Sequence, residues 1–133
     1  MTNSFQLDIV TPTSVINEGL VDYVRAPALD GLFGIEAGHA PAIIGLGIGE
    51  IKVNKGSDII FYSTSGGYAD IRSEGVMLLL ESVEEASEID QKRADEAVKR
   101  AKSRLGNDRL DKIRARAALE RAKNRLKISH HND

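Results

Sequence analysis

The C-terminal third of the chain, residues 87–128, has the apolar spacing of two consecutive helices, and this feature constrains the fold most. Apolar residues recur there at intervals of three and four, which places them along one side of a helix. The first stripe consists of Ile89, Ala94, Ala97, Val98, Ala101 and Leu105, and the second of Leu110, Ile113, Ala115, Ala118, Leu119, Ala122 and Leu126. Ser87 and Asp90 have the spacing of a capping box at the start of the first helix. Residues 106–108 form a short turn, so we expect an antiparallel helical hairpin.

Two properties of this predicted hairpin indicate that it is more than a structural appendage, namely a weak apolar seam that can open and a strong basic charge. Its apolar faces are mostly alanine and bury little area, and burial stabilises by only about 25 cal/mol per Å². Residues 91–133 hold 14 Lys and Arg against 6 Asp and Glu, whereas residues 1–90 hold 4 against 14. The formal net charge of −2 therefore conceals a basic C-terminal part and an acidic N-terminal part.

The acidic N-terminal part has the pattern of a β-sandwich, with short strands separated by turn residues. We expect strands at residues 5–10, 15–16, 20–26, 42–53, 59–64, 68–72 and 76–83, and a loop at 27–41. Gly45, Gly47 and Gly49 share one strand face, which predicts close approach by another part of the chain. The predicted fold class is α+β. A flattened antiparallel β-sandwich or barrel spans residues 1–86, an acidic hinge lies at 84–88, and a two-helix hairpin with a disordered tail spans 87–133.

Few residues suit catalysis or metal binding. The chain has no cysteine, and we expect the adjacent His130 and His131 to lie in a disordered tail and not in a metal site. His39 stands in a glycine-rich loop without an obvious nucleophile and carboxylate, and no phosphate-binding glycine motif is present. We therefore expect no enzymatic activity and no required cofactor. No apolar run reaches the ~20 residues of a membrane span, so membrane association would come through a partner.

Four arginines of the predicted hairpin are candidates for binding an anion. Arg93 and Arg100 lie seven residues apart on the first helix, and Arg121 and Arg125 lie four apart on the second. An antiparallel hairpin brings Arg93 near the level of the second pair, and guanidinium forks suit phosphate oxygens. Alternatively, these arginines form a solvated basic face neutralised by nearby carboxylates, namely Asp90, Asp95 and Glu120. The basic charge also suits nucleic acid, but the helices lack aromatic residues for base stacking, and an acidic protein partner fits the charge equally well.

Several short motifs resemble those of the epsilon subunit of bacterial F-type ATP synthases, in the same order over nearly the whole chain. They are Leu7-Asp8-Ile9-Val10-Thr11-Pro12, Gly34-Ile35 with Gly38-His39-Ala40-Pro41, Ser65-Gly66-Gly67, and Ala122-Lys123-Asn124-Arg125-Leu126. The resemblance implies a β-sandwich followed by two helices, in a non-catalytic subunit of the central stalk. It also implies binding to the gamma subunit and the membrane rotor ring, and a peripheral position on the cytoplasmic face of the cell membrane.

The resemblance further implies contact residues in both parts of the chain. On the sandwich the expected contacts are Leu32, Phe33 and His39, with Leu32 standing where many relatives carry a glutamate. In this family the hairpin can leave the sandwich, extend along gamma and restrain ATP hydrolysis. The expected contacts with the catalytic alpha/beta hexamer are basic residues of the second helix: Arg114, Arg116, Arg121 and Lys123.

Some family members bind ATP on the folded hairpin through the pattern Ile/Leu-Asp-x-x-Arg-Ala, which stands here as Ile89-Asp90-Gln91-Lys92-Arg93-Ala94. With the matching partner positions, the implied ATP-binding set is Glu84, Ile89, Asp90, Arg93, Ala94, Arg100, Arg121 and Arg125. The arginines would hold the phosphates, and bound ATP would act as a regulatory ligand that favours the compact hairpin. The alternative function is a free-standing ATP-binding sensor that acts on another partner.

Overall fold

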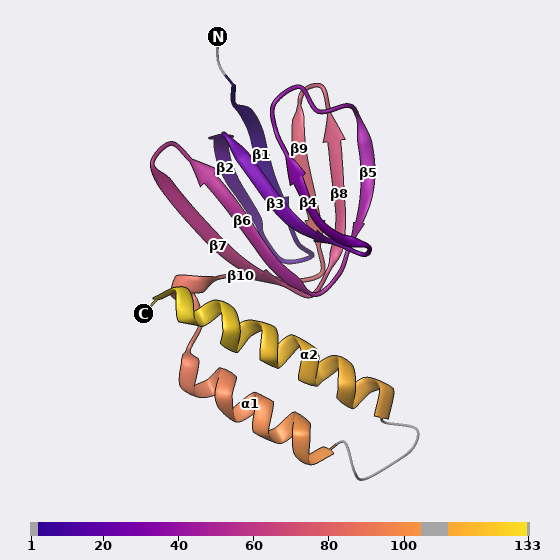
Figure 1. Cartoon of the computed structure of the whole chain (residues 1–133), viewed down its shortest axis with the longest axis vertical. Coiled ribbons are helices and arrows are strands. Elements are labelled where there is room, and N and C mark those ends of the chain that lie inside the picture. Colours follow the sequence, from indigo (N-terminus) through magenta and orange to yellow (C-terminus); the bar gives the residue numbers. More distant parts are fainter. Residues whose placement is uncertain (1–2, 105–111, 133) are drawn as a thin grey trace.

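The computed structural model of the chain describes residues 3–104 and 112–132, which form a β-sandwich and a pair of helices (Figure 1). The α+β fold class expected from the sequence is therefore confirmed. The turn expected at residues 106–108 lies outside the described residues. Neither of the two helices in the described part of the chain is long and apolar enough to cross a membrane.

The sandwich is built from short strands that follow one another along the chain. They are β1 (Phe5–Val10), β2 (Val15–Val21), β3 (Tyr23–Ala28), β4 (Gly31–Ile35), β5 (Ala42–Leu46), β6 (Gly49–Lys55), β7 (Asp58–Thr64), β8 (Gly67–Arg72), β9 (Gly75–Leu80) and β10 (Val83–Glu85). Hydrogen-bonded neighbours follow the order β10-β7-β6-β3-β5-β8-β9-β1-β2, and β4 pairs with β3. Most pairs are antiparallel as expected, but β1 and β9 run parallel. This pairing places the first strand beside one of the last.

The core lies between the layers of the sandwich and follows from alternation along the strands. In β1, Leu7 and Ile9 are fully buried, while the side chains between them are not. In β9, Leu78 is fully buried and its neighbour Leu79 is partly exposed. Successive side chains of a strand point to opposite faces, so this alternation assigns one face of each strand to the core.

One polar pair lies at the edge of this core. The hydroxyl of Tyr62 in β7 donates a hydrogen bond to the carboxylate of Glu18 in β2, and both residues are buried. Burial, with the hydrogen bond to Glu18 as the next cause, raises the pKa of Tyr62 far above the ordinary tyrosine value. The folded state therefore strongly favours the neutral phenol.

The glycines of β5 and β6 are in close contact with β3 and the turn that follows it, which confirms the predicted close approach. A Cβ atom at Gly49 would lie 2.5 Å from Cβ of Pro27. A Cβ atom at Gly45 would lie 2.9 Å from Cδ1 of Leu29. Both distances are shorter than real Cβ contacts, so only glycine fits without a shift.

Several strand predictions were wrong. Residues 42–53 were expected to form one strand, but they form β5 and β6 with a break at residues 47 and 48, so Gly45 and Gly49 lie on different strands. Residues 27–41 were expected to form a loop, but they contain β4, which pairs with β3 and ends at the fully buried Ile35. Gly19 was expected between strands, but it lies inside β2 with a φ of +74°, where the register with β1 shifts. A left-handed residue is typical of a β-bulge, and glycine adopts this conformation without strain.

The C-terminal part consists of a 3₁₀ turn η1 (Ala86–Glu88), helix α1 (Gln91–Arg104), helix α2 (Lys112–Ser129) and a second 3₁₀ turn η2 (His130–Asn132). The expected helix start at Ser87 was wrong, because Ser87 lies in η1. Asp90 caps α1 instead, accepting the backbone N–H of Arg93 at 3.1 Å. The preceding Glu84 and Glu85, expected in a hinge, pair with β7 as part of β10.

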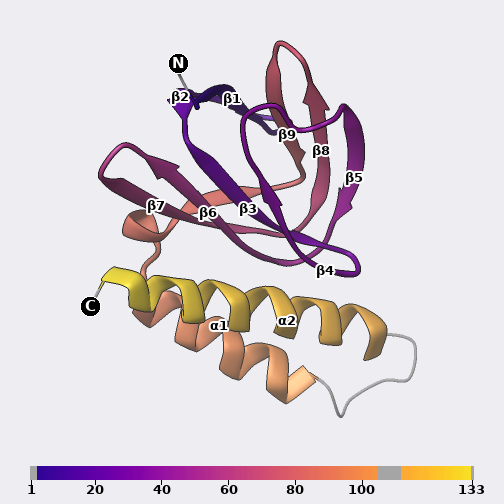
Figure 2. The same cartoon turned by 45° about the horizontal axis from the view of Figure 1, so that its top comes forward.

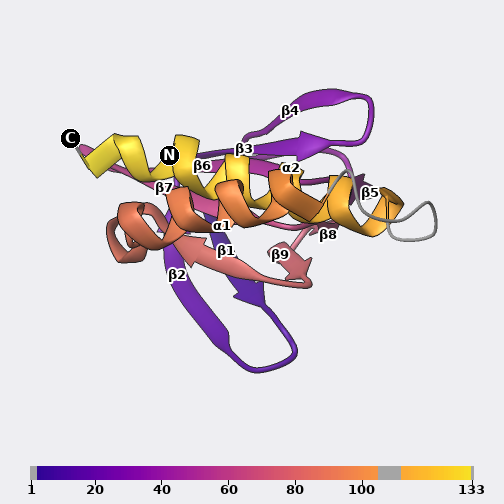
Figure 3. The same cartoon turned by 90° about the horizontal axis from the view of Figure 1, so that it is seen from below.

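Helix α2 lies between α1 and the sandwich in Figures 1 and 2, and Figure 3 shows the two helices running side by side beneath the strands. Where α1 meets α2, small residues form a buried cluster around Val98, Ala101, Leu119 and Ala122. A second cluster joins the helices to the sandwich and contains Ala86, Ile89, Ala94 and Ile128, with Phe61 of β7 packed against it. The hairpin is thus held to the sandwich by one small apolar cluster near the C-terminal end of α2.

The C-terminal tail is ordered through Asn132, so the expectation of a disordered tail was wrong. Ile128 and Ser129 are fully buried, and the side-chain amide of Gln91 donates to the backbone carbonyl of Ser129 at 3.0 Å. The ring of His131 stacks on Phe61. These tertiary contacts hold the last turn in place.

Candidate functional site: the junction of helix α2 and the sandwich

Asn124 of α2 attaches the helix to the sandwich through both hydrogens of its side-chain amide. Its Nδ2 donates to the backbone carbonyl of Gly49 in β6 at 2.8 Å and to Oγ of Ser63 in β7 at 3.1 Å. Ser63 is buried, so this contact lies inside the junction. Asn124 belongs to the motif Ala122-Lys123-Asn124-Arg125-Leu126, but its position in the sequence predicted no role for it. The sequence feature that could have indicated this contact is a short polar side chain next to the alanine stripe of a basic helix.

Arg125, the next residue of α2, forms a two-pronged ion pair with Glu84 of β10. Its Nε donates to Oε1 at 2.7 Å and its Nη2 donates to Oε2 at 3.2 Å. This hydrogen bonding raises the pKa of Arg125 above its ordinary value, and Glu84 and Asp90 add to the shift through their charges. The pair joins two residues that the sequence placed in one candidate site.

A pocket of about 270 Å³ opens beside this ion pair, between α2 and the strands. It is lined by Ser63, Thr64, Ser65, Ser82, Val83, Glu84, Arg121 and Arg125. Two guanidinium groups and several hydroxyls can donate hydrogen bonds to an anion, a chemistry that suits phosphate oxygens. Its volume is just below the range of pockets that enclose a drug-sized ligand, so this pocket fits part of a nucleotide.

The structure brings together three members of the expected ATP-binding set here, namely Glu84, Arg121 and Arg125. The other members of the expected set do not line this pocket.

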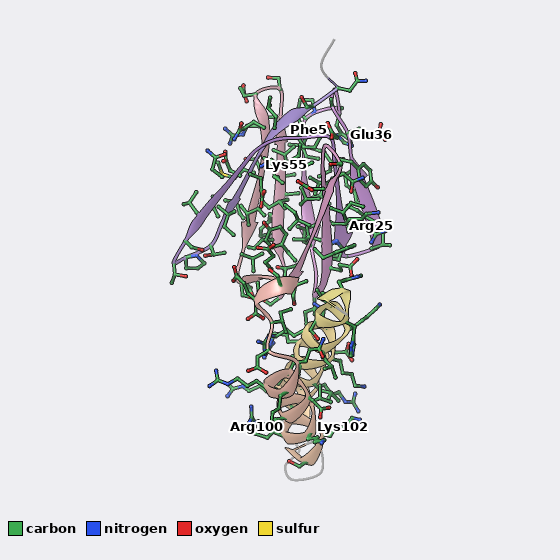
Figure 4. The ribbon with its side chains drawn as sticks, turned by 90° about the vertical axis from the view of Figure 1, so that its left-hand side faces the viewer. Phe5, Arg25, Glu36, Lys55, Arg100 and Lys102 are labelled. Carbon is green, nitrogen blue, oxygen red and sulfur yellow. The ribbon has the colours of Figure 1, made fainter. Side chains whose placement is uncertain are left out.

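Ile89 and Ala94 are buried in the apolar cluster, where they contribute packing. Arg93 and Arg100 have exposed side chains on α1 and do not line this pocket. Figure 4 shows Arg100 near the end of the hairpin that is farthest from the sandwich.

The last turn of the chain forms a second polar contact with the sandwich, which sequence reasoning missed. Nε2 of His131 donates to Oε2 of Glu50 in β6 at 2.6 Å, and Arg25 of β3 donates to Oε1 of Glu50 at 2.9 Å. The His131 ring lies parallel to that of Phe61, with 3.7 Å between the ring centroids and 6° between the planes. These partners lie far away in sequence, so no local spacing indicates the contact.

The contact residues expected on the sandwich lie at and after the turn between β3 and β4. Leu29 and Leu32 are 78% and 69% exposed. Phe33 is partly buried and its ring meets that of His39 edge-on, with 5.3 Å between centroids. Leu29 and Leu32 form an exposed apolar rim, which we call the β3–β4 rim, while Phe33 packs against the core of the sandwich.

A second exposed apolar surface lies on the outer face of neighbouring strands β5, β8 and β9. It contains Ile43, Tyr68, Met77 and Leu79. Tyr68 is paired with Leu79 across the two strands, so their side chains share this face. We call it the β5–β8–β9 face.

The basic residues expected to contact other subunits, Arg114, Arg116, Arg121 and Lys123, all have exposed side chains on α2. In the described part of the chain, no group of three or more His, Asp or Glu residues could hold a metal ion. The junction therefore offers hydrogen-bond donors for an anion and a basic helix for an acidic partner.

Comparison with known proteins places both parts of the chain in one family. A family model for the β-sandwich domain of the ATP synthase delta/epsilon chain matches residues 4–86, and one for its long α-helix domain matches residues 87–130. The ATP synthase epsilon chain of Syntrophobacter fumaroxidans is 40% identical over 131 residues, covering 97% of this chain and 98% of that protein. That of Desulforamulus reducens is 36% identical over 107 residues, covering 80% and 81%.

The fold also matches a chain in the structure of the Euglena gracilis mitochondrial ATP synthase, with its OSCP, F1 and c-ring, at a TM-score of 0.85 and 23% identity. That match covers 98% of this chain and 84% of the other. A second match, to the central stalk and c-ring of the Tetrahymena thermophila enzyme, has a TM-score of 0.64 and 14% identity, and covers 94% and 96%. With both of its parts matched in order, the chain belongs to the ATP synthase delta/epsilon family, as an epsilon chain.

Proposed function

We propose that this epsilon chain couples the gamma subunit to the membrane rotor ring and restrains ATP hydrolysis through a movable helical hairpin. The observation that carries the proposal is the arrangement at the junction. Helix α1 packs on α2, and α2 is held to the sandwich by one small apolar cluster and a few polar side chains. Such an attachment can open while the core of the sandwich stays intact.

The exposed apolar surfaces of the sandwich support binding to other subunits. The β3–β4 rim adjoins the β5–β8–β9 face, because Leu29 lies over the outward side of Gly45, the residue that pairs with Tyr68. Exposed apolar patches of this kind are typical of protein interfaces. An extended apolar surface suits binding to gamma and to the rotor ring, with His39 and Phe33 beside it. It favours this role over a free-standing sensor, and binding to these partners would hold the chain at the cytoplasmic face of the membrane.

Regulation by ATP is the second part of the proposal. Arg121 and Arg125 would hold phosphate oxygens in the pocket at the junction, with Glu84 orienting Arg125. ATP bound there would contact both α2 and the sandwich, so it would stabilise the compact hairpin by mass action. A contribution from Arg93 and Arg100 rests on the sequence pattern. We propose no reaction and no required cofactor for the chain itself.

Restraint of hydrolysis would come from the basic face of α2. Arg114, Arg116 and Lys123 are exposed in the compact form, and a released hairpin could present them to acidic loops of the catalytic alpha/beta hexamer. The long-range attraction between opposite charges would guide the hairpin to that partner.

The test is ATP hydrolysis by a reconstituted alpha–beta–gamma complex with the full chain added. Combined Arg114→Ala, Arg116→Ala and Lys123→Ala should raise the rate toward that of the complex alone. The matched control is Lys99→Ala with Lys102→Ala on the exposed face of α1. Equal inhibition by the wild type and the triple variant would refute the role of this face. A calorimetric titration with ATP, repeated with Arg121→Ala, tests the nucleotide site.

A further inference from the structure

The β5–β8–β9 face does not end at β9, because the sheet continues through β1 to β2. Strand pairing aligns one apolar residue from each of β8, β9, β1 and β2 on the outer side of the sheet, namely Tyr68, Leu79, Val10 and Val15. Leu29 extends this line over β5, where it lies on Gly45. Neighbouring strands are about 4.8 Å apart, so the line, which we call the apolar row, is about 19 Å long.

Next to the apolar row, the same face alternates apolar and acidic side chains. Met77 of β9 is paired with Asp70 of β8 on one side and with Asp8 of β1 on the other. A hollow of about 390 Å³ opens here, and Arg72 and Glu74 also line it. Three carboxylates and one guanidinium give this acidic hollow a formal charge of −2.

The guanidinium of Arg72 pairs with only one of the three carboxylates. Its Nη2 lies 2.9 Å and its Nε 3.1 Å from Oδ2 of Asp70. Asp8 accepts a hydrogen bond from the side-chain amide of Gln6 at 3.4 Å, and Glu74 accepts one from the hydroxyl of the preceding residue. Within residues 3–104 and 112–132, no basic side chain forms an ion pair with Asp8 or Glu74. These two carboxylates are therefore available to a cation from outside the chain.

We propose that this face binds a protein segment that presents apolar side chains to the apolar row and a lysine or arginine to the acidic hollow, where Asp8 and Glu74 accept its charge. This inference rests on the proposed function and names the chemistry by which the sandwich recognises its partner in the stalk. Residues 1–90 hold 4 Lys and Arg against 14 Asp and Glu, so long-range attraction also favours a basic partner. Burial of the apolar row supplies affinity, and the matched charge supplies specificity.

Other occupants of this face fit its charge less well. A second copy of the chain, bound through the same face, would bring two acidic surfaces together, and like charges across an interface repel. A membrane surface with anionic lipids would be repelled for the same reason. The basic hairpin of the chain itself is engaged elsewhere, because α2 packs against β6 and β7. A basic protein partner therefore remains the occupant that the charges favour.

The test measures binding of the full chain to two probes, the reconstituted alpha–beta–gamma complex and the purified rotor ring, at several salt concentrations. Asp8→Asn removes one charge and keeps an oxygen that can accept from Gln6, so the strand should stay intact. It should weaken binding to at least one probe about tenfold and make that binding less sensitive to salt. Val15→Thr makes the exposed β2 end of the apolar row polar. It should weaken the same binding about twofold without changing its salt dependence.

Asp58→Asn is the matched control, because it removes an exposed carboxylate of the same kind from β7, which is not part of this face. It should bind both probes as the wild type does. Unchanged affinity of Asp8→Asn for both probes, or an equal loss in Asp58→Asn, overturns the proposal, and the proposed function then still stands on inhibition of ATP hydrolysis. Dimers of the wild type in sedimentation that Val15→Thr dissociates would identify a second copy as the occupant and also overturn it. If the wild type binds neither probe, the proposal and the proposed function are both refuted.

Discussion

Replacement of Asn124 by alanine should release the hairpin without unfolding the sandwich. The substitution removes two hydrogen bonds, to the carbonyl of Gly49 and to Oγ of Ser63, and leaves the buried Ser63 with one partner fewer. Each hydrogen bond contributes about 0.5–1.5 kcal/mol net, so docking should lose about 1–3 kcal/mol. A change of this size raises the opening equilibrium of the junction about 5-fold to 150-fold.

Amide hydrogen exchange on the full chain measures this opening. Protection of the backbone amides in the C-terminal half of α2, such as that of Ile128, should fall by the same factor. Protection of core amides in the strands, such as that of Leu78, should stay near the wild-type value, because Asn124 makes no contact within the sandwich core. In the reconstituted complex, the same variant should inhibit ATP hydrolysis more strongly than the wild type.

The control for this prediction is Lys123→Ala, which truncates the adjacent exposed side chain of the same helix. It should change the exchange of α2 by less than about 0.5 kcal/mol, as is usual for a surface substitution. If Asn124→Ala changes α2 protection less than twofold, the amide does not hold the helix. If strand amides lose protection equally, the hairpin and the sandwich open as one unit, and a separately moving hairpin is refuted.

Three other substitutions test separate parts of the structure. Asp90→Ala should destabilise the hairpin by about 1 kcal/mol, because it removes the side chain that accepts the backbone N–H of Arg93. Thermal unfolding followed by helical circular dichroism measures this change, and an unchanged midpoint would contradict the capping role. The raised pKa of Tyr62 stabilises the fold below the unfolded tyrosine pKa of about 10, and this contribution is lost as the pH rises above it. Urea titrations from pH 8 to 11 should therefore show an alkaline loss of stability that Tyr62→Phe lacks, and equal losses would refute the assignment. Glu84→Gln should weaken both docking without ATP and ATP binding, because it removes the carboxylate that orients Arg125. Tighter calorimetric binding would show that Glu84 competes with phosphate for Arg125 instead.

The sequence predicted the parts of the fold that depend on local pattern. Alternation gave the buried positions Leu7 and Ile9, and the spacing of small residues gave the stripe that joins the two helices. It missed β4, because a five-residue strand with two glycines reads as a loop until its pairing with β3 is known. Strand pairing is a tertiary contact, and it overrides weak local preference.

Only part of the candidate site was predicted, because spacing in the sequence shows which residues are neighbours on one helix and not which residues meet across the fold. Spacing along one helix placed Arg121 and Arg125 together, and the structure adds Glu84 from β10 to the same pocket. The role of Asn124 and the ordered His131 depend on partners 61 to 81 residues away in sequence. Residues so far apart meet only through the topology of the sheet, which periodicity does not determine.

The composition of the two apolar clusters bears on how the hairpin can move. The cluster around Val98 and Leu119 lies wholly between α1 and α2, so it stays intact if both helices leave together. The cluster around Ile128 must open, because Phe61 of the sandwich packs against it. Broken polar contacts are largely replaced by bonds to water, whereas the exposure of Ile128 has no such compensation. The energy of release is therefore concentrated at the C-terminal end of α2, where Ile128 packs against the sandwich.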